Sequence, residues 1–203
     1  MKYSTIYNDP VGRSNIIHPW TYWDDGFTET ELNKLENYCD SLELINATTV
    51  GSKDNIEESK KIRKSHICWI HKNDKSAWIF NRLNFIVQNS NEQYYNFDLN
   101  GYECIQYTMY NDEEKGNYGW HMDMCMEIDM GEPRKLSLTL LLNDGFEGGK
   151  FQINKGVEKN CETVPTKKGR AIIFPSWLIH QVTPVTKGTR KSIVVWVTGP
   201  KFQ

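Results

Sequence analysis

Three features are missing from this 203-residue sequence, and each absence argues against a class of protein. No stretch approaches about 18 consecutive apolar residues, and the N-terminal segment MKYSTIYNDPVGRSN has no apolar core, so we expect neither a membrane span nor an export signal. The net charge of −2 gives no overall attraction to nucleic acid or to an anionic membrane. The five cysteines include no CxxC pair, which favours reduced thiols, buried as small apolar residues, in the cytoplasm.

Hydrophobic spacing divides the chain into a helical portion and a strand-rich portion. A helix is predicted over residues 28–44, with Thr28 as its N-cap and Glu31 completing a capping box, and a second helix is predicted within SAWIFNRLNFIVQ. From Tyr102 onward about eight short strands are separated by Gly, Pro, Asn or Asp. We therefore expect a mainly β, α+β chain whose core is a double-stranded β-helix (jelly roll, cupin-like) with N-terminal helices packed on one sheet. We expect one domain over residues 1–203, helical at about 20–95 and jelly-roll at about 100–200.

Four residues in the strand-rich portion suit a metal and an anion. His121 and Asp123 lie two positions apart on a predicted strand, so both side chains would point to one face and reach one point in space. His180, on a neighbouring predicted strand, completes a set of two imidazoles and one carboxylate. Such a set leaves coordination positions open, as non-haem Fe(II) requires when it holds a co-substrate and O2 together. Arg190 supplies a fixed cationic fork for a carboxylate.

Longer segments carry a resemblance to a known family. From about residue 27 to residue 200, the chain resembles the Fe(II)/2-oxoglutarate-dependent dioxygenases, and within them the prolyl 4-hydroxylase-like branch. The matching segments are IRKSHICWI, YTMYNDEEKGNYGWHMD, LLLNDGFEGGKFQI and KKGRAIIFPSWLIHQVTPVTKGTRKSIVVW. In that branch the basic residue that binds 2-oxoglutarate follows the second histidine by about ten positions, as Arg190 follows His180. Nucleic-acid demethylases of the superfamily use a longer gap, so we expect no nucleic-acid substrate.

The resemblance implies roles for the residues around the metal. His121, Asp123 and His180 would be the Fe(II) ligands and form the catalytic centre, and Arg190 would bind the far carboxylate of 2-oxoglutarate. Trp196 matches a tryptophan behind the co-substrate, with simple packing as the alternative. By strand alternation, Ser192, Val194 and Trp196 should share the face of Arg190, whereas Lys191, Ile193 and Val195 should take the other face.

Further contacts to the co-substrate are expected from hydroxyl groups. Tyr110 matches the family tyrosine that hydrogen-bonds 2-oxoglutarate, apart from one extra residue before the histidine, and Tyr107 is its rival. This sequence has Leu141 where well-known prolyl hydroxylases have a second tyrosine. Thr139 shares the face of Leu141 and could replace the missing hydroxyl. Ser192 could do so as well, and we favour it because an Arg-x-Ser pair can hold one carboxylate from two sides.

The substrate entrance is expected near two residues. Arg63 matches a family arginine at the entrance, with an exposed charge at a strand end as the alternative. Tyr118 matches an aromatic residue that lines the entrance. The polar segment 46–61 is expected to cover bound substrate. The pair Gly148 and Gly149 is expected to form a turn between strands, with close approach of the backbone to the metal site as the second interpretation.

These observations favour one function and leave two alternatives open. The favoured function is an Fe(II)- and 2-oxoglutarate-dependent dioxygenase that hydroxylates a substrate C–H bond, with a prolyl residue of a protein or peptide as the target. The same chemistry on a small molecule or another amino-acid residue is the first alternative. A metal-binding jelly-roll module without turnover is the second. The resemblance also implies O2 as co-substrate and L-ascorbic acid as reductant.

Overall fold

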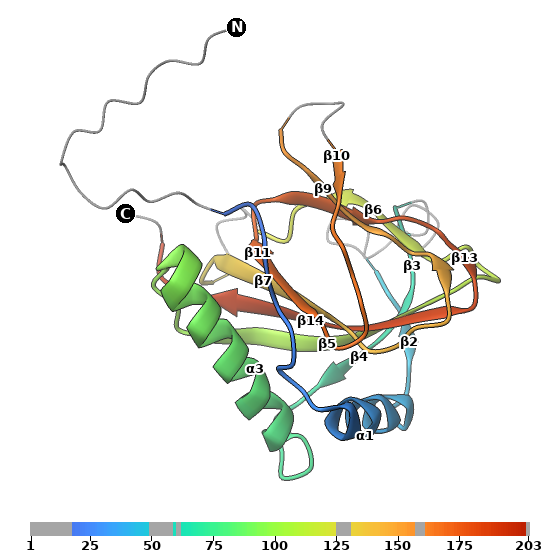
Figure 1. Cartoon of the computed structure of the whole chain (residues 1–203), viewed down its shortest axis with the longest axis horizontal. Helices are drawn as coiled ribbons and strands as arrows, with labels where there is room; N and C mark the ends of the chain where they lie inside the picture. The colour runs from blue at the N-terminus through green and yellow to red at the C-terminus, as the bar shows by residue number, and fades with distance from the viewer. Residues whose placement is uncertain (1–17, 49–58, 60–61, 125–130, 157–160, 202–203) are drawn as a thin grey trace, which may run out of the picture.

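Two antiparallel sheets packed face to face form the body of the molecule (Figure 1). The computed structural model describes residues 18–48, 59, 62–124, 131–156 and 161–201. The larger sheet contains, in spatial order, β1 (Thr21–Trp23), β11 (Ala171–Pro175), β7 (Arg134–Leu141), β14 (Thr189–Thr198), β5 (Gly101–Asn111), β4 (His66–Ile70) and β2 (Ile45–Asn46). The smaller sheet contains β10 (Cys161–Thr163), β9 (Phe151–Asn154), β12 (Ile179–Val182), β6 (Asn117–His121) and β3 (Arg63–Lys64). β8 (Glu147–Gly148) and β13 (Val185–Lys187) form a short ribbon.

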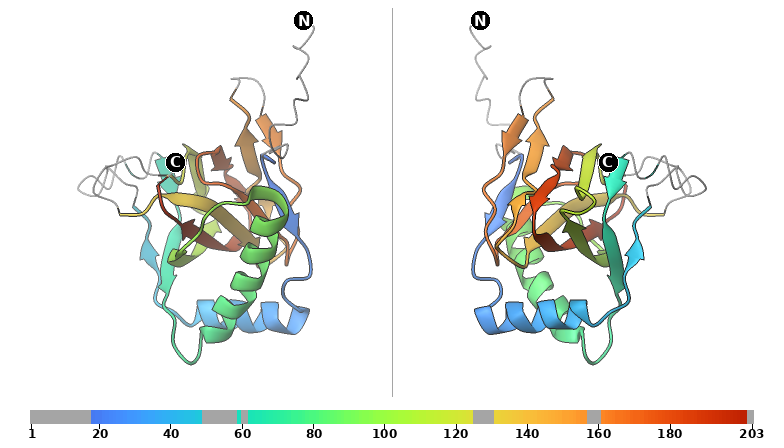
Figure 2. Two further views of the ribbon diagram at one scale, coloured as in Figure 1. Left: turned by 90° about the vertical axis from the view of Figure 1, so that its left-hand side faces the viewer. Right: turned by 90° about the vertical axis from the view of Figure 1, so that its right-hand side faces the viewer.

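Two helices pack on the larger sheet. The capping box at Thr28 forms as predicted and starts α1 (Glu29–Asp40), but the helix ends four residues earlier than expected. The reason is that the chain turns at Ser41, whose N–H donates to the Tyr38 carbonyl, and β2 then pairs with β4. The second predicted helix is α3 (Ala77–Ser90), which continues into a π-helical turn, η1 (Asn91–Tyr95). Figure 2 shows both helices on one side of the strands.

Alternation along the strands of the larger sheet separates two apolar cores. On β14, Ile193 and Val195 are fully buried toward the helices, in a core shared with Leu35 and Leu83. The opposite face of the sheet closes a second core against the smaller sheet, where Phe151 is buried with its neighbours on β11 and β12. The predicted jelly-roll double sheet with helices on one side is thereby confirmed. The metal motif is expected between the two sheets.

Several expectations meet a limit or a correction in the observed fold. Cys39 and Cys68 are buried free thiols, whereas Cys161 is exposed on the edge strand β10, so the expectation of general burial is wrong there. Most of the segment expected to cover substrate, residues 49–58 and 60–61, lies outside the described residues, as does Cys125. No helix in the described parts of the chain is long and apolar enough to cross a membrane.

Candidate metal centre

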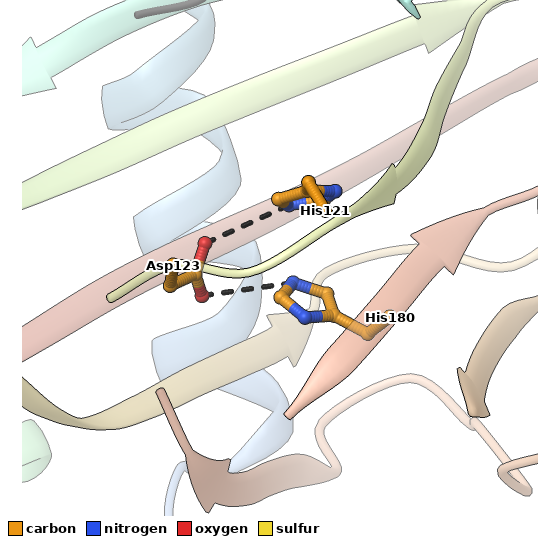
Figure 3. A group of neighbouring side chains, drawn as sticks. All are labelled: His121, Asp123 and His180. Atoms are coloured by element: carbon orange, nitrogen blue, oxygen red, sulfur yellow. Dashed lines mark ion pairs between the residues drawn. The ribbon is translucent and has the colours of Figure 1, made fainter. Parts of the chain in front are cut away.

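His121, Asp123 and His180 meet between the two sheets. His121 is the last residue of β6 and is the cross-strand partner of His180 on β12. One ligand atom from each of the three residues lies within 4.8 Å of the others. Asp123 and His180 are buried, and the side chain of His121 is 14% exposed. Figure 3 shows the carboxylate facing both imidazoles. The three residues predicted as ligands are therefore brought together.

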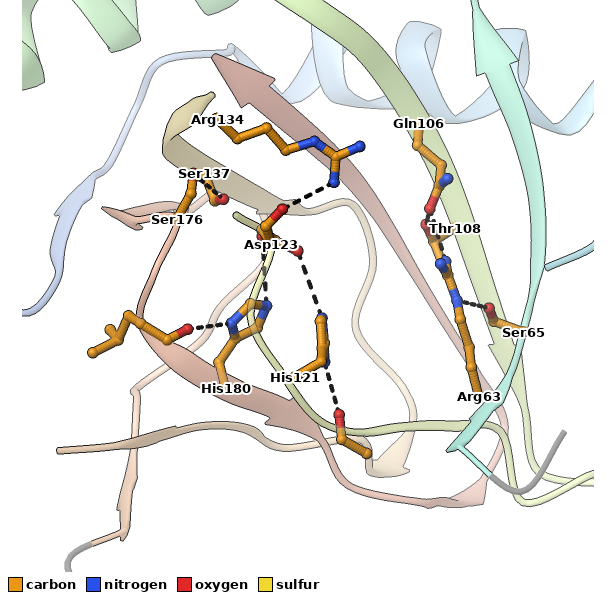
Figure 4. A network of polar contacts seen from close by, with 12 residues as sticks. Arg63, Ser65, Gln106, Thr108, His121, Asp123, Arg134, Ser137, Ser176 and His180 are labelled. Atoms are coloured by element: carbon orange, nitrogen blue, oxygen red, sulfur yellow. Dashed lines mark hydrogen bonds and ion pairs between the residues drawn. The ribbon is translucent and has the colours of Figure 1, made fainter. Parts of the chain in front are cut away.

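Asp123 reaches this site by a route that strand alternation does not describe. β6 ends at His121, so the expectation that His121 and Asp123 share a strand is wrong. The backbone N–H groups of Asp123 and Met124 both donate to the Ser176 carbonyl, at 3.0 and 2.9 Å. Arg134 Nη1 also donates to the Asp123 carbonyl at 3.2 Å (Figure 4). These backbone bonds, rather than a pleat, aim the carboxylate at the histidines.

Hydrogen bonds fix which nitrogen of each imidazole faces the site. His121 Nδ1 lies 2.7 Å from the Gly119 carbonyl, and His180 Nδ1 lies 2.8 Å from the Leu178 carbonyl. A carbonyl oxygen can only accept, so each Nδ1 carries the proton and each Nε2 presents its lone pair. The two Nε2 atoms lie 3.6 Å from different oxygens of Asp123. This orientation, set by a backbone carbonyl behind each ring, is typical of metal-ligating histidines.

The charges at the site suit a divalent cation. Burial lowers the pKa of His180 to about 4, so its imidazole is neutral at pH 7 and able to bind a metal. Burial alone would raise the pKa of Asp123, but His180 and His121 outweigh it and lower the pKa below the usual range. Asp123 Oδ2 is buried and lacks a hydrogen-bond partner within the described residues. A buried carboxylate oxygen of this kind requires a cation, and the two-histidine, one-carboxylate donor set fits Fe(II).

Arg190 is a buried cation beside this centre. Its side chain is 2% exposed, and its Nη1 donates to Ser192 Oγ at 2.9 Å. Its guanidinium lies 5.5 Å from the centre of the Tyr110 ring, the cross-strand neighbour on β5. Burial lowers the pKa of Arg190, yet no carboxylate among the described residues pairs with it. A guanidinium so placed needs an anion to offset the cost of removing its charge from water.

The cavity that joins the metal centre to Arg190 has a mixed wall. It is lined by polar and aromatic groups of both sheets, including Tyr110, Tyr118, Thr139, Phe151, Phe174 and Trp196. Phe174 and Phe151 pack on the His180 ring, with ring centres 4.7 and 5.6 Å away. Trp196 Nε1 is buried without a hydrogen-bond partner within the described residues. The wall thus offers hydroxyl and indole donors beside charged and aromatic side chains.

The structure distinguishes the alternative hydroxyl groups by their positions. Tyr107 lies on the helix side of the larger sheet, where its hydroxyl donates to Asp40 at 2.6 Å, whereas Tyr110 lines the cavity. Thr139 also lines the cavity. Ser192 accepts the hydrogen bond from Arg190 and is not among the residues that line the cavity. Tyr110 and Thr139 are therefore the hydroxyl groups placed to reach a bound molecule.

Arg63 is not the exposed strand-end charge that was the alternative to an entrance role. Its side chain is only 6% exposed, and it lines both the inner cavity and an adjoining pocket of about 570 Å³. Its Nε donates to Ser65 at 2.8 Å and its Nη2 donates to Gln106 at 2.7 Å (Figure 4). The guanidinium also lies 4.6 Å from the centre of the Tyr118 ring.

Gly148 and Gly149 each have a positive φ, of +76° and +56°. A Cβ at Gly148 would lie 2.2 Å from the Pro184 carbonyl oxygen, as the turn interpretation requires. A Cβ at Gly149 would lie 2.9 Å from Arg190 Cδ. The backbone therefore does approach the site closely, but at the arginine rather than at the metal ligands.

Two residues of the site were not predicted from the sequence. Arg134 holds the Asp123 carbonyl, forms a two-pronged ion pair with Glu103 and stacks 4.4 Å from the Trp196 ring. Gln106 holds Arg63. Alternation back from Tyr110 would have placed Gln106 on the cavity face, but no local signal distinguishes Arg134 from other charged residues at strand starts.

Comparison with known proteins agrees with this geometry. Residues 105–198 match the 2OG-Fe(II) oxygenase superfamily. A PKHD-type hydroxylase of Alteromonas mediterranea is 34% identical over 90 residues, which make up 41% of this chain and 39% of that relative. The crystal structure of a Pseudomonas putida prolyl-4-hydroxylase superposes with a TM-score of 0.69 at 20% identity, covering 91% of this chain and 94% of the other. A prolyl hydroxylase from Trichoplax adhaerens, solved with a hypoxia inducible factor peptide fragment, gives 0.70 at 18% identity, covering 91% and 84%.

The strand-rich part of the chain is thus similar to the 2OG-Fe(II) oxygenase superfamily, in agreement with the resemblance seen in the sequence. The matched stretch contains all three candidate ligands and Arg190. The similarity to the solved structures shows the fold. The chain spans about two fifths of the length of the first curated relatives that it matches. The activity and substrate of those relatives are therefore not carried over to this chain as findings.

Proposed function

We propose that this protein is an Fe(II)- and 2-oxoglutarate-dependent hydroxylase. The observation that carries the proposal is the pairing of two features in one cavity. Two imidazole Nε2 atoms and an unpartnered carboxylate oxygen converge on one point, and the buried Arg190 lacks a carboxylate partner within the described residues. The first feature suits Fe(II), and the second suits a dicarboxylate co-substrate.

In this proposal His121, Asp123 and His180 are the catalytic metal ligands. Bound Fe(II) would activate O2 with 2-oxoglutarate as the reductant, so that one oxygen atom enters the substrate C–H bond and the other enters succinate as CO2 leaves. The chain's own share is to hold the three ligands, keep the remaining coordination positions open and exclude water. Phe151 and Phe174, packed on His180, supply the dry wall.

The co-substrate is proposed to lie between the metal and Arg190. Arg190 would bind the far carboxylate of 2-oxoglutarate, and Ser192 would hold the guanidinium in position. Tyr110 and Thr139 would donate hydrogen bonds from the wall, and Trp196 would close the cavity behind the molecule with its unpartnered N–H turned to an acceptor. A binder without turnover has no evident need for this second anchor, which is why we favour an enzyme.

The proposed substrate is a prolyl residue of a protein or peptide. The pocket of about 570 Å³ that meets the metal cavity at Arg63 has a volume typical of ligand sites, and it is larger than a co-substrate alone would require. The Trichoplax adhaerens structure carries a peptide fragment, and the Pseudomonas putida protein is named as a prolyl-4-hydroxylase. Tyr118 would line the entrance to this pocket. The alternative is the same chemistry on a small molecule or on another amino-acid residue.

The experiment that tests the proposal couples two measurements. Purified protein with Fe(II) and 2-oxoglutarate is incubated with a library of proline-containing peptides, and succinate and peptide masses are followed together. We expect succinate to form in proportion to a product heavier by one oxygen atom on proline. The same mass gain on a residue other than proline would select the alternative substrate class. No 2-oxoglutarate turnover with any peptide or small acid would contradict the enzyme and leave a binding module.

Three further expectations belong to this proposal. Ascorbate is proposed as the reductant that maintains Fe(II), to be checked by its effect on turnover number. A cytoplasmic location is proposed from the free thiols Cys39, Cys68, Cys104 and Cys161. Residues 1–203 are proposed to act as one domain, with no nucleic-acid or membrane partner.

A further inference from the structure

Three side chains form a stack that ends at a metal ligand. The Tyr118 ring lies parallel to the His121 imidazole, with ring centres 3.5 Å apart and an interplanar angle of 12°. On the Tyr118 ring lies the guanidinium of Arg63, 4.6 Å from its centre. Arg63 and Tyr118 are cross-strand partners on β3 and β6, so the sheet register holds the two together. The guanidinium of Arg63 and the imidazole of His121 therefore both lie against the Tyr118 ring.

The outer member of the stack is anchored to the larger sheet. Arg63 donates to Ser65 and to Gln106, and Gln106 Oε1 also accepts from Thr108 Oγ1 at 3.0 Å. Gln106 and Thr108 are 2% and 0% exposed. The guanidinium is therefore fixed to β5 by a buried network (Figure 4). It also lies over the Tyr118 ring of the smaller sheet. Such a group bridges the two sheets at the level of the metal centre.

The stack restrains the His121 ring in addition to its hydrogen bond with the backbone. The bond from Nδ1 to the Gly119 carbonyl fixes one atom of the ring, but the ring can still tilt about the line through that contact. A parallel aromatic face at 3.5 Å opposes this tilt. His180 is restrained differently, because the Phe174 ring meets it edge to face. His121 is also the more exposed of the two imidazoles, at 14% against 6%, so it has more need of a restraint.

We propose that Arg63 is a positioning residue that acts through Tyr118 on His121, rather than a ligand of the substrate. By holding the Tyr118 ring flat, Arg63 keeps the imidazole plane aligned with the point where the three ligand atoms converge. The inference rests on the metal centre proposed above. It predicts that Arg63 affects metal affinity and ligand field, which a residue that only contacts substrate would leave unchanged.

The test titrates Co(II), as a stable probe for Fe(II), into the full chain and records both the dissociation constant and the d–d absorption bands. Tyr118→Leu should weaken Co(II) binding by about 10-fold, as loss of a supporting contact to a metal ligand typically does, and should shift the bands. Tyr118→Phe keeps the ring and should retain wild-type values. Arg63→Gln should weaken binding by several-fold with a shift in the same direction, and Arg63→Lys should restore part of the loss because a cation remains on the ring.

Lys64→Gln is the matched control, since it removes one positive charge from the next position of β3, where the side chain is exposed. It should leave the Co(II) constant and bands unchanged. Wild-type Co(II) values in Arg63→Gln, with a raised KM for substrate, would overturn the inference and restore Arg63 as a substrate ligand. If Arg63→Gln does not fold, Ser65→Ala loosens the same guanidinium and gives the same readout. Failure of the wild-type chain to bind Co(II), or unchanged binding in His121→Ala, would instead contradict the metal centre itself.

Discussion

Arg190 and Arg63 are both buried, at 2% and 6% exposure, but they differ in the hydrogen bonds that the described residues make with them. Both line the cavity at the metal centre, both lie near a tyrosine ring, and neither pairs with a carboxylate among the described residues. Arg63 directs two of its nitrogens to protein oxygens, Ser65 Oγ between β3 and β4 and Gln106 Oε1 on β5. Within the described residues, Arg190 directs only one nitrogen to a protein acceptor, Ser192 Oγ. The difference lies in how many donors are left for a ligand.

Under the proposals above, this difference separates a residue that supports the site from a residue that binds the co-substrate. A guanidinium has five N–H donors, and a buried donor without a partner is costly. Two of the three guanidinium nitrogens of Arg63 donate to protein oxygens, so this buried side chain is stabilised without a bound ligand. Arg190 lines the cavity and makes one side-chain hydrogen bond within the described residues, so a carboxylate that enters can form further charge-assisted bonds with it. Burial and charge alone would not have distinguished the two.

The largest effect that would sharpen this comparison is expected from Arg190→Ala. Loss of one partner from a buried, hydrogen-bonded charge pair costs about 2–5 kcal/mol, so 2-oxoglutarate should bind at least roughly 30-fold more weakly to the Co(II)-loaded protein. The 2-oxoglutarate affinity of Arg190→Lys should lie between those of the wild type and Arg190→Ala, because lysine keeps the charge but loses the two-pronged geometry of the guanidinium. Calorimetric titration measures both, with Co(II) affinity as the control that should change little. Unchanged 2-oxoglutarate affinity in Arg190→Ala, with loss in Arg63→Gln, would exchange the two roles.

A smaller effect on the same anchor is expected from Gly149→Ala. The added Cβ would meet Arg190 Cδ at 2.9 Å and would also sit at a φ of +56°. We expect about a 10-fold loss of 2-oxoglutarate affinity, because the guanidinium must move while the metal ligands stay in place. Gly145→Ala is the matched control, since its φ of +84° imposes similar backbone strain with no atom within 4 Å of the added Cβ. Equal losses in both variants would show that strain, rather than contact with Arg190, is responsible.

On the scaffold side, Gln106→Leu should lower the free energy of unfolding. It leaves Arg63 Nη2 without its acceptor in a buried position, which costs about 1–3 kcal/mol. Chemical denaturation measures this loss, and 2-oxoglutarate affinity should change by less than that of Arg190→Ala. Thr108→Val is the matched control, because it removes a second donor to the same Gln106 oxygen without touching Arg63. A larger effect on co-substrate binding than on stability would place Gln106 in the binding site instead.

The features of the fold and of the site that depend on local pattern could be predicted from the sequence. The capping box at Thr28 depends on residues three apart, and it forms as predicted. The alternation along β14 correctly separates Arg190 from Lys191, which pairs with Glu36 and Asp40 of α1 on the other face. The set of His121, Asp123 and His180 was found from residue type and spacing, and the three residues do converge. The first two predictions depend on few residues or on one strand, whereas the third combines residues from two paired strands and the loop that follows β6.

What the sequence could not predict depends on contacts between distant segments. Asp123 is aimed by backbone bonds to Ser176, and no pattern within the HMDM motif encodes them. The burial of Arg63 follows from the pairing of β3 with β6 and from Gln106, forty-three positions away. The rivalry between Tyr107 and Tyr110 is a question of which sheet face meets the helices, which alternation alone leaves open. Such pairings are set by the packing of the whole double sheet.

The smallest effect is expected at an arginine that already has its anion. Arg170 forms a two-pronged ion pair with Asp24, both bonds at 2.8 Å, and lies over the Tyr22 ring. The hydrogen bond from Arg170 lowers the pKa of Asp24 from 3.8 to about 2, although burial opposes the shift.

A carboxyl whose pKa is lowered on folding stabilises the fold above its unfolded pKa and loses this contribution as the pH falls through its folded pKa. Because the pair lies at the surface and both side chains remain partly exposed, Asp24→Asn should cost only about 1 kcal/mol or less at pH 7, and the cost should disappear between about pH 4 and pH 2. Urea denaturation across this range measures it, with Glu147→Gln, which breaks a more exposed pair with Lys187, as a control expected to show almost no change. A loss above about 3 kcal/mol at pH 7 would mean that a paired arginine can matter to this fold as much as the two unpaired ones, and the distinction drawn from Arg190 and Arg63 would then be wrong.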